Sequence, residues 1–297
     1  MRISMLSPVY NEQQHVAEMI SSMQNQTHEG WELVFVDDGS TDATAEIISR
    51  FASTDSRIRL VSRGNKLGKV AAFNLAFEQS RGEVIGITGG DDVHPPGALA
   101  LRVRALSGIP DSVPGSAFFK LRMFSADPKF DGLTLPRGSK GSRSGPSITM
   151  NRALAGMLFP IPANLVSEDI WLGEASEDIA TRVIEDLHIV VNYRVHAGNS
   201  NPRHKSFTRM NESMHARAMA WRSLLDQESL ELTEPKRRSL ESKCRAEDFR
   251  YDGRTFRVLA VHRLPIVDRL AFASMSSATL FQVRSRFYKF FSGRRGR

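Results

Sequence analysis

Cysteine is nearly absent from this chain of 297 residues, because Cys244 is the only one. A single cysteine cannot form an internal disulfide, and it excludes a metal site built from several thiolates. Long apolar runs are also missing: no stretch has the roughly 18 apolar residues that a membrane-spanning helix needs. The N-terminus lacks the apolar run of a signal peptide as well. Together these absences predict a protein of the cytoplasm, where thiols stay reduced.

Acidic residues are missing from the C-terminal tail, residues 284–297, which holds six Lys and Arg residues. The formal net charge of the whole chain is +7, so all other residues together contribute only +1. This distribution argues against a globally basic nucleic-acid binder, and we expect no nucleic acid as a partner. Four aromatic residues interleave with the cations of the tail: Phe287, Tyr288, Phe290 and Phe291.

Two interpretations of the tail remain open. Aromatic residues beside Lys and Arg are typical of a helix that lies on an anionic membrane, which predicts a peripheral contact with the inner face of the plasma membrane. A helix that docks on the rest of the protein, with frayed basic residues, explains the same composition. The uncharged segment before the tail, residues 270–283, is too short to span a bilayer.

Two nucleotide-binding motifs are absent too. No Gly-x-Gly-x-x-Gly follows any expected strand, which excludes the dinucleotide fingerprint. Residues 64–70 resemble half of a phosphate-binding P-loop, but the spacing is one residue short and Val70 replaces the metal-binding hydroxyl. The sequence therefore argues against an ATPase of the P-loop class.

The first 92 residues contain an alternation of strand and helix patterns. Apolar runs predict strands at residues 3–9, 33–36, 58–61 and 84–88. Amphipathic segments between them predict helices near residues 16–23, 41–51 and 70–77. This alternation is typical of an α/β fold in which a mostly parallel sheet is joined by right-handed crossovers.

Paired carboxylates follow two of these expected strands. Asp37 and Asp38 end the second strand, and Asp91 and Asp92 follow the fourth. In a parallel sheet these ends lie at one edge, where open α/β sheets bind ligands. Clustered carboxylates repel one another, so a site that keeps them ionised usually contains a cation. A divalent metal that bridges phosphates explains the pattern most simply.

Four motifs in this order resemble those of inverting family 2 glycosyltransferases with the GT-A fold. The motifs are Ser7-Pro8-Val9-Tyr10-Asn11-Glu12, Val36-Asp37-Asp38-Gly39-Ser40-Thr41-Asp42, Asn65-Lys66-Leu67-Gly68-Lys69 with Asn74, and Gly90-Asp91-Asp92. Their spacing covers roughly residues 3–100. The resemblance implies a Rossmann-like, mostly parallel central sheet flanked by helices. It also implies a nucleotide-diphospho-sugar donor, usually linked to uridine, and a divalent cation, Mn²⁺ or Mg²⁺.

The same resemblance implies roles for single residues. Asp91 would bind the metal, although Gly89 replaces the first Asp of the family's Asp-x-Asp motif and removes one ligand. A later Tyr193-Arg194-Val195-His196 segment resembles another family motif, in which His196 would bind the metal or the diphosphate. Donor binding would involve Pro8, Tyr10, Glu12, Asp37, Asp38, Lys69, Gly90, Asp91 and Arg194.

A Glu-Asp pair occurs twice between these motifs. Glu168 and Asp169 follow Ser167, which can cap the helix that it opens, and acids are stabilised at a helix N-terminus. The resemblance implies that Asp169 is the general base that takes the proton of an acceptor hydroxyl. The second copy, Glu177-Asp178, would leave too short a helix (residues 170–183 expected) before a strand at residues 188–193.

The remaining segments complete the expected organisation. Residues 108–147 are rich in Gly, Pro, Ser, Lys and Arg, which predicts either a mobile lid or an ordinary surface loop. Two helices are expected at residues 210–225 and 235–249. We therefore expect a catalytic domain over residues 1–205 and a helical C-terminal extension over residues 206–297.

These observations favour an inverting glycosyltransferase that acts on a carbohydrate or lipid-linked acceptor, in bacterial-type polysaccharide or glycolipid synthesis. A non-catalytic sugar-nucleotide-binding protein on a degenerate GT-A fold is the main alternative, because Gly89 weakens the metal site. A nucleotidyltransferase lacks support, since no Gly-rich triphosphate loop follows the first strand. A nucleic-acid-binding adaptor would depend on the tail alone.

Overall fold

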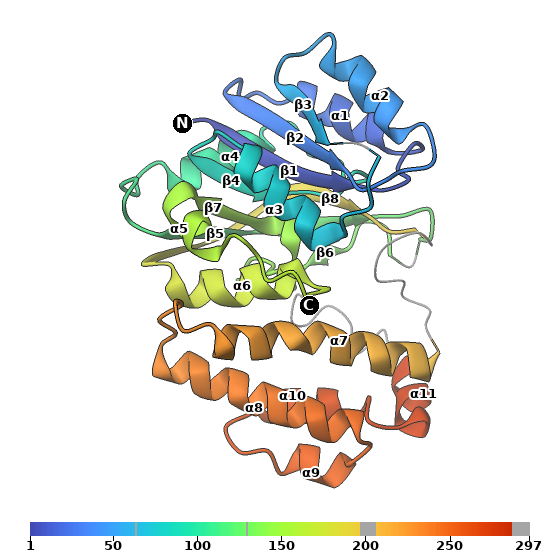
Figure 1. Cartoon of the computed structure of the whole chain (residues 1–297). Coiled ribbons are helices and arrows are strands. Elements are labelled where there is room, and N and C mark those ends of the chain that lie inside the picture. Colours follow the sequence, from blue (N-terminus) through green and yellow to red (C-terminus); the bar gives the residue numbers. More distant parts are fainter. Residues whose placement is uncertain (63, 129, 197–205, 287–297) are drawn as a thin grey trace.

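The computed structural model describes residues 1–62, 64–128, 130–196 and 206–286. Figure 1 shows an α/β body that holds both the N-terminus and a twisted sheet, with a layer of helices from the C-terminal part of the chain below it. The part of the tail at residues 287–297, with its interleaved aromatic residues, lies outside the described residues.

The first half of the sheet is parallel, as the sequence predicts. Its strands lie in the order β3-β2-β1-β4. Every residue of β2 is buried, which explains its unbroken apolar run. Val9 at the end of β1 lies opposite Asp37 at the end of β2, so the two strands end together. The bounds are β1 Ile3–Val9, β2 Trp31–Asp37, β3 Ile58–Ser62 and β4 Val84–Ile87.

Helices cover both faces of this half. The expected apolar stripe of the first helix is fully buried, as are Ile48 of the second helix and Phe73 of the third. A fourth helix, α4, follows β4. The bounds are α1 Val16–Gln24, α2 Thr44–Ala52, α3 Lys69–Gln79 and α4 Ala98–Leu106.

The second half of the sheet is mixed. β7 is antiparallel to β4 and to β5, whereas β8 runs parallel to β5. The prediction that residues 108–147 form a lid or surface loop is wrong for β5, because its first seven residues are buried in the middle of the sheet. The bounds are β5 Gly115–Phe124, β6 Thr134–Leu135, β7 Ile148–Asn151 and β8 Arg182–Arg194.

Two helices and one turn of 3-10 helix complete the body. α6 ends at Ile179 rather than near residue 183, because residues from Arg182 onward pair with β5 instead. The expected cap is also wrong: Ser167 precedes α6, but its buried hydroxyl makes no hydrogen bond. The bounds are α5 Arg152–Leu158 and α6 Glu168–Ile179, and the 3-10 turn covers Gly145–Ser147.

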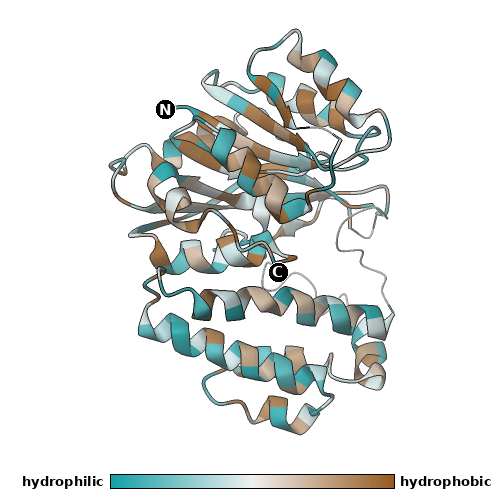
Figure 2. Cartoon of the chain, in the orientation of Figure 1, coloured by the Kyte–Doolittle hydropathy of each residue, from teal (hydrophilic) through white to brown (hydrophobic). Residues whose placement is uncertain are grey.

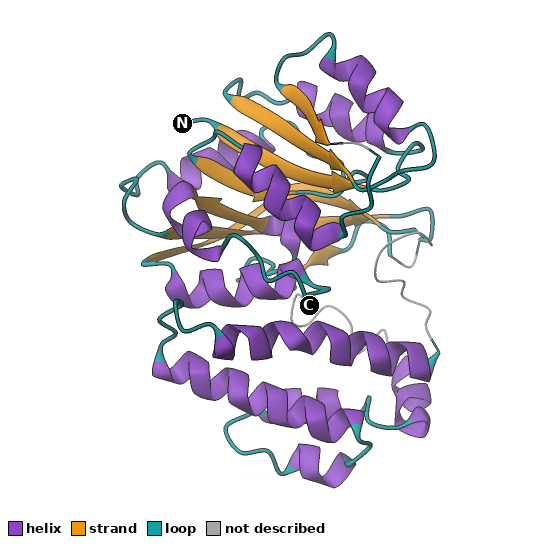
Figure 3. Ribbon diagram, in the orientation of Figure 1, coloured by secondary structure: helices purple, strands orange, loops and turns teal. Residues whose placement is uncertain are grey.

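The C-terminal helices lie against α6. In Figure 3, α6, α7 and α8 follow one another as successive helical layers below the sheet. A single buried apolar cluster contains Leu172 of α6, Leu224 of α7 and Leu240 of α8. No helix in the described part of the chain is long and apolar enough to cross a membrane. The bounds are α7 Phe207–Asp226, α8 Glu234–Tyr251, α9 Thr255–Leu259, α10 Ile266–Ala273 and α11 Ala278–Arg286.

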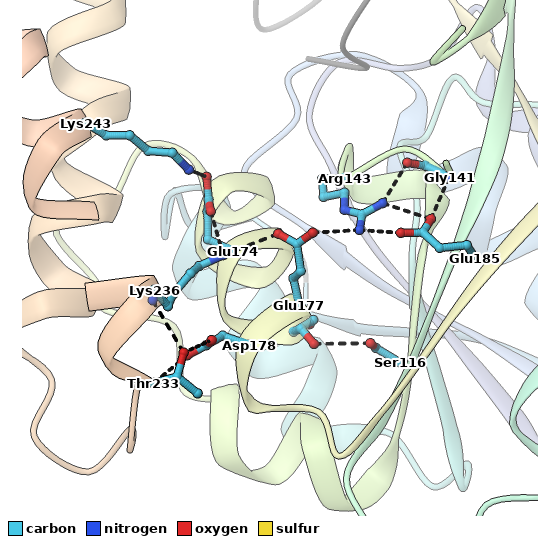
Figure 4. A network of polar contacts seen from close by, with 11 residues as sticks. Ser116, Gly141, Arg143, Glu174, Glu177, Asp178, Glu185, Thr233, Lys236 and Lys243 are labelled. Carbon is cyan, nitrogen blue, oxygen red and sulfur yellow. Dashed lines mark hydrogen bonds and ion pairs between the residues drawn. The ribbon is translucent and has the colours of Figure 1, made fainter. Parts of the chain in front are cut away.

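Apolar and polar residues separate as this layering requires. Figure 2 shows mostly hydrophobic strands inside the body, whereas α8 carries many hydrophilic residues. A polar network nevertheless connects the layers (Figure 4). Glu174 of α6 is buried between two lysines of α8, with Lys236 Nζ at 2.8 Å and Lys243 Nζ at 2.6 Å from its carboxylate oxygens. Arg143 pairs with Glu177 on the other side of α6, at 2.8 Å.

Candidate active site

The end of β2 and the turn after it hold two of the predicted carboxylates, Asp37 and Asp38. Asp38 Oδ1 accepts hydrogen bonds from the backbone N–H groups of Leu67 and Gly68, at 2.6 and 2.8 Å. Asp37 Oδ1 accepts one from the N–H of Ser40, at 3.1 Å. Both carboxylates are nearly fully buried. The loop before α3 is therefore fastened to the end of β2, and Asp38 has a structural partner there.

An exposed aromatic ring lies beside this turn. Tyr10, which directly follows β1, is 46% exposed, and Lys66 Nζ lies 3.1 Å from the centre of its ring. The same ammonium group is 3.6 Å from Asp38 Oδ2. Pro8 is half-buried on β1, opposite Val36. Sequence reasoning assigned no role to Lys66, although it belongs to a recognised motif.

Lys69 contacts the start of α6. Its Nζ is 2.6 Å from Glu168 Oε1. Asp169 follows, and its Oδ2 accepts a hydrogen bond from Arg217 Nη2 of α7 at 3.2 Å. Sequence reasoning missed Arg217, because nothing in its own helix marks it as facing a carboxylate 48 residues earlier.

A second cluster of carboxylates lies at the end of β4. Burial, together with the charges of Asp91 and Asp42, raises the pKa of Glu12 to about 7, although Arg194 opposes this shift. Burial and the charge of Asp91 likewise raise the pKa of Asp92 to about 8. One oxygen of Asp92, Oδ1, is buried without a hydrogen-bond partner. This concentration of negative charge is what a cation would relieve.

Two residues from the end of β8 reach this cluster. His196 Nε2 lies 2.9 Å from Asp91 Oδ2. Arg194 Nε donates to the backbone oxygen of Asp91 at 2.9 Å, and its Nη2 lies 2.5 Å from Glu18 Oε2. The His15 ring of the turn before α1 is 5.0 Å from the His196 ring. The structure thus brings Glu12 and Asp91 together with Arg194 and His196.

Both glycines before Asp91 are closely surrounded. A Cβ atom at Gly90 would lie 2.7 Å from Val9 Cγ1 and 3.1 Å from Glu12 Cγ. A Cβ atom at Gly89 would lie 2.5 Å from Asp91 Oδ1. The backbone N–H of Gly89 also donates to Asp92 Oδ2 at 3.1 Å. The departure from the Asp-x-Asp pattern therefore leaves space that the Asp91 carboxylate occupies.

The residues at this edge fit a divalent cation that is shared with a ligand. Among the described residues, no group of three or more His, Cys, Asp or Glu side chains is arranged to hold a metal by itself. Mg²⁺ is nevertheless usually bound by one or two carboxylates together with the phosphates of a substrate. Asp91 supplies such a carboxylate, the His196 ring beside it offers a nitrogen ligand, and Glu12 adds a second carboxyl group next to Asp91.

These groups occupy one edge of the sheet. Tyr10, Asp38 and Asp91 follow the ends of β1, β2 and β4. A Cβ atom at Gly145 would lie 2.9 Å from Ile87 Cδ1, in the last residue of β4, and 3.7 Å from Asp169 Cβ. The start of α6 therefore also borders the end of β4, while Glu177 and Asp178 lie at the far end of that helix.

Comparisons with known proteins identify related sequences and folds. Residues 4–134 match the family described as Glycosyl transferase family 2. The chain is 36% identical to the glycosyltransferase GlyG of Streptococcus pneumoniae over 91 residues, which are 31% of this chain and 30% of that protein. It is 32% identical to the putative teichuronic acid biosynthesis glycosyltransferase TuaG of Bacillus subtilis over 90 residues, 30% of this chain and 36% of TuaG. The matched stretch thus spans about a third of these relatives.

Solved structures share the fold over nearly the whole chain. The mannosyltransferase PcManGT from Pyrobaculum calidifontis, in complex with GDP-Man and Mn²⁺, matches with a TM-score of 0.63 and 19% identity, over 97% of this chain and 88% of that one. TarS residues 1–349 of S. aureus, in complex with UDP-GlcNAc, match with a TM-score of 0.60 and 17% identity, over 99% and 90%. The mixed central sheet and the helical C-terminal region are common to this fold.

Proposed function

We propose that this chain, whose residues 4–134 match glycosyl transferase family 2 and which has the GT-A fold, transfers a sugar from a nucleotide-diphospho-sugar to an acceptor hydroxyl, with inversion at the anomeric carbon. The observation that carries this proposal is the convergence of Glu12, Asp91 and His196 at the end of β4, at the edge of the sheet that also holds the exposed ring of Tyr10. An aromatic surface next to a cation site suits a nucleotide and its diphosphate.

The donor in this proposal is linked to uridine. The Tyr10 ring offers a stacking surface for a base. Lys66 contacts both this ring and the buried Asp38 carboxylate. The complex of TarS with UDP-GlcNAc supports a uridine nucleotide, whereas the complex of PcManGT with GDP-Man makes guanosine the alternative.

Asp91 and His196 would hold Mn²⁺ or Mg²⁺, which, when bound, supplies positive charge for the departing diphosphate. This chain's own residues surround that position. Arg194 orients the Asp91 backbone, and Glu12 lies beside Asp91. The complex of PcManGT with Mn²⁺ supports a metal in this fold.

Asp169 is the general base of the proposed reaction. Its carboxylate takes the proton of the acceptor hydroxyl while that oxygen bonds to the anomeric carbon and the bond from this carbon to the diphosphate breaks. Arg217 holds the carboxylate from α7, and the Glu168–Lys69 ion pair fixes the start of α6. Positioning of this kind supplies much of the rate of such reactions.

The acceptor that we propose is a growing bacterial-type polysaccharide or a lipid-linked glycan, handled at the cytoplasmic side of the membrane. The similarity to TuaG, whose name places it in teichuronic acid biosynthesis, supports a polysaccharide. The segments that would select an acceptor are the ones between α4 and α6 and the C-terminal helices.

Calorimetry with UDP and GDP, each with and without Mn²⁺, tests this proposal. We expect UDP to bind only with the metal, and Asp91→Ala to abolish that binding. Asp111→Ala removes an exposed Asp far from the motifs and should bind UDP as the parent does. No binding of any nucleotide would rule out the donor site. Binding without transfer to any acceptor would favour the sugar-nucleotide-binding alternative, for which Gly89 is the specific observation.

A further inference from the structure

The far end of the C-terminal helices exposes large apolar side chains. Phe256 of α9 is 87% exposed, and Ile266 of α10 is 69% exposed. Exposure of this degree is unusual for such residues when several lie within fifteen positions of one another. We call this set the apolar patch; its members are Phe256, Leu259, Ile266, Val267 and Leu270.

The patch belongs to well-packed helices rather than to loose ends. Val258, Leu264 and Phe272 point the opposite way and are buried. Arg269 Nε donates to the backbone oxygen of Leu264 at 2.7 Å, and its Nη1 donates to that of Leu259 at 3.2 Å. These bonds fasten α10 to the end of α9, so the two helices present their apolar residues next to the same turn.

Cations surround this patch. Arg254, Arg257 and Arg263 are exposed on or beside α9. Arg263 has a φ angle of 65°, a left-handed conformation that a residue with a side chain adopts at a cost. A pocket of about 320 Å³ opens at the same turn, between α8 and the segment after α9. It is lined by Arg238, Glu241, Ser242, Arg245, His262 and Arg263.

We propose that the apolar patch and the basic pocket beside it dock this protein on a membrane surface that contains anionic lipids. The apolar side chains would enter the boundary between headgroups and acyl chains, as on other interfacial helices. The arginines of the pocket would bind lipid phosphate through charge-assisted hydrogen bonds. Because no described helix can span a bilayer, this contact is peripheral.

Charge favours a lipid surface over a second copy of the chain. In a two-fold dimer two copies of the patch would face each other, which brings Arg257 and Arg263 of both copies into one interface. Repulsion between these like charges opposes such a dimer. An anionic surface instead complements Arg257 and Arg263, whereas Arg254 pairs with Asp252.

Sedimentation of the full-length chain with vesicles tests the proposal. We expect binding to vesicles of phosphatidylcholine mixed with phosphatidylglycerol, weaker binding to phosphatidylcholine alone, and loss of binding as salt is raised. Phe256→Ser/Ile266→Ser should weaken binding about tenfold or more, because two exposed apolar anchors are removed. Arg257→Gln/Arg263→Gln should weaken it similarly, at about fivefold for each arginine.

Matched controls use exposed residues of β8. Leu187→Ser, at a position 52% exposed, and Arg182→Gln should leave binding unchanged. If both double variants sediment with the vesicles as the parent does, the proposal is overturned, and binding belongs to another part such as the tail. Light scattering gives the mass of each double variant in solution. If that mass differs from the mass of the parent while vesicle binding is unchanged, the patch is a self-association surface and the proposal is overturned.

Discussion

Asp169 and Asp178 are equivalent in chemistry but occupy opposite ends of α6, so they form a matched test of the proposed base. Asp169→Asn removes the proton acceptor and should lower the rate of transfer by about 10²- to 10⁴-fold, because that is the usual contribution of a general base. Binding of UDP should stay close to that of the parent. Initial rates of UDP release, with calorimetry on the same preparation, measure both.

Asp178→Asn is the control. Its carboxylate accepts hydrogen bonds from the backbone and side chain of Thr233, at the start of α8, at 2.9 and 2.6 Å. This substitution changes a contact between helices and should leave the rate near that of the parent. Equal losses in both variants would show that the loss comes from the fold of α6, and that Asp169 is not the base.

Arg217 of α7, which contacts Asp169 of α6, can be tested in the same way. Arg217→Gln shortens the side chain and removes its charge, which loosens its hold on Asp169, and we expect transfer to slow by about tenfold to a hundredfold, since small displacements of a catalytic group have effects of this size. The Michaelis constant for the donor should hardly change. Steady-state kinetics with varied donor concentration separates the two effects.

Arg222, one and a half turns further along α7, provides the matched control. It pairs with Asp248 of α8. Arg222→Gln should therefore keep the parent rate. If Arg217→Gln also transfers at the parent rate, Arg217 does not position the base.

The sequence indicates some of these site residues and not others, for a physical reason. Asp38 and Asp91 follow the ends of parallel strands, so the topology of the sheet predicts that they share one edge, and the family resemblance adds Glu12. The contact of Arg217 with Asp169 depends on how α7 packs on α6. No local pattern specifies that packing, so this part of the site required the structure.

At the scale of elements, the network around Glu174 connects α6 to α8 (Figure 4). Glu174→Gln removes the buried acid between Lys236 and Lys243 and leaves Lys236 only its longer pair with Glu177, at 3.4 Å, so we expect a loss of roughly 3–5 kcal/mol in the free energy of unfolding. Urea unfolding followed by circular dichroism measures this quantity. The expected effect is large because Glu174 is buried where it meets the two lysines.

Glu234→Gln makes the same chemical change at an exposed pair. Glu234 and Arg238 are 69% and 55% exposed, so solvent screens their attraction. We expect a loss below about 1 kcal/mol. A loss of similar size in the two variants would contradict the view that the buried network fastens the C-terminal helices to the body.

The strand β5 shows where sequence reasoning fails at this scale. Its residues are buried, but Gly, Pro, Ser and basic residues dominate the flanking segments, and Lys120 interrupts the apolar pattern. The structure explains Lys120: its Nζ donates to the backbone oxygens of Pro136 and Gly138 at 2.7 and 2.6 Å. Once β5 is missed, the early start of β8 is missed too, because β8 is defined by pairing with β5.

At the scale of the whole molecule, the pH dependence of stability has opposing contributions. Burial lowers the pKa of His94 from 6.5 to about 3, so between these values the unfolded chain binds the additional proton and stability falls as the pH falls. The raised pKa values of Glu12 and Asp92, about 7 and 8, act in the opposite direction, because there the folded chain binds the additional proton.

Comparison with His94→Gln isolates the first contribution. From pH 7 to pH 5 the parent should lose about 2 kcal/mol relative to this variant, at about 1.4 kcal/mol per pH unit below 6.5. Urea unfolding at both pH values measures the difference. His188→Gln, at a ring that is 62% exposed, should behave almost as the parent. Parallel pH profiles of the parent and His94→Gln would contradict the assignment.

The division of the chain also belongs to this scale. We propose residues 1–205 as the catalytic part and residues 206–297 as an extension, with a boundary that lies outside the described residues. Their apolar residues share one buried cluster, and Arg217 of the extension reaches Asp169. The proposed reaction therefore uses groups from both parts.

The space around Gly89 limits the order in which this site can change over evolutionary time. A side chain at position 89 would lie against Asp91 Oδ1, so a mutation that introduced an acid there would move the carboxylate that meets His196. The fitness effect of a change at position 89 thus depends on how Asp91 and His196 adjust to it.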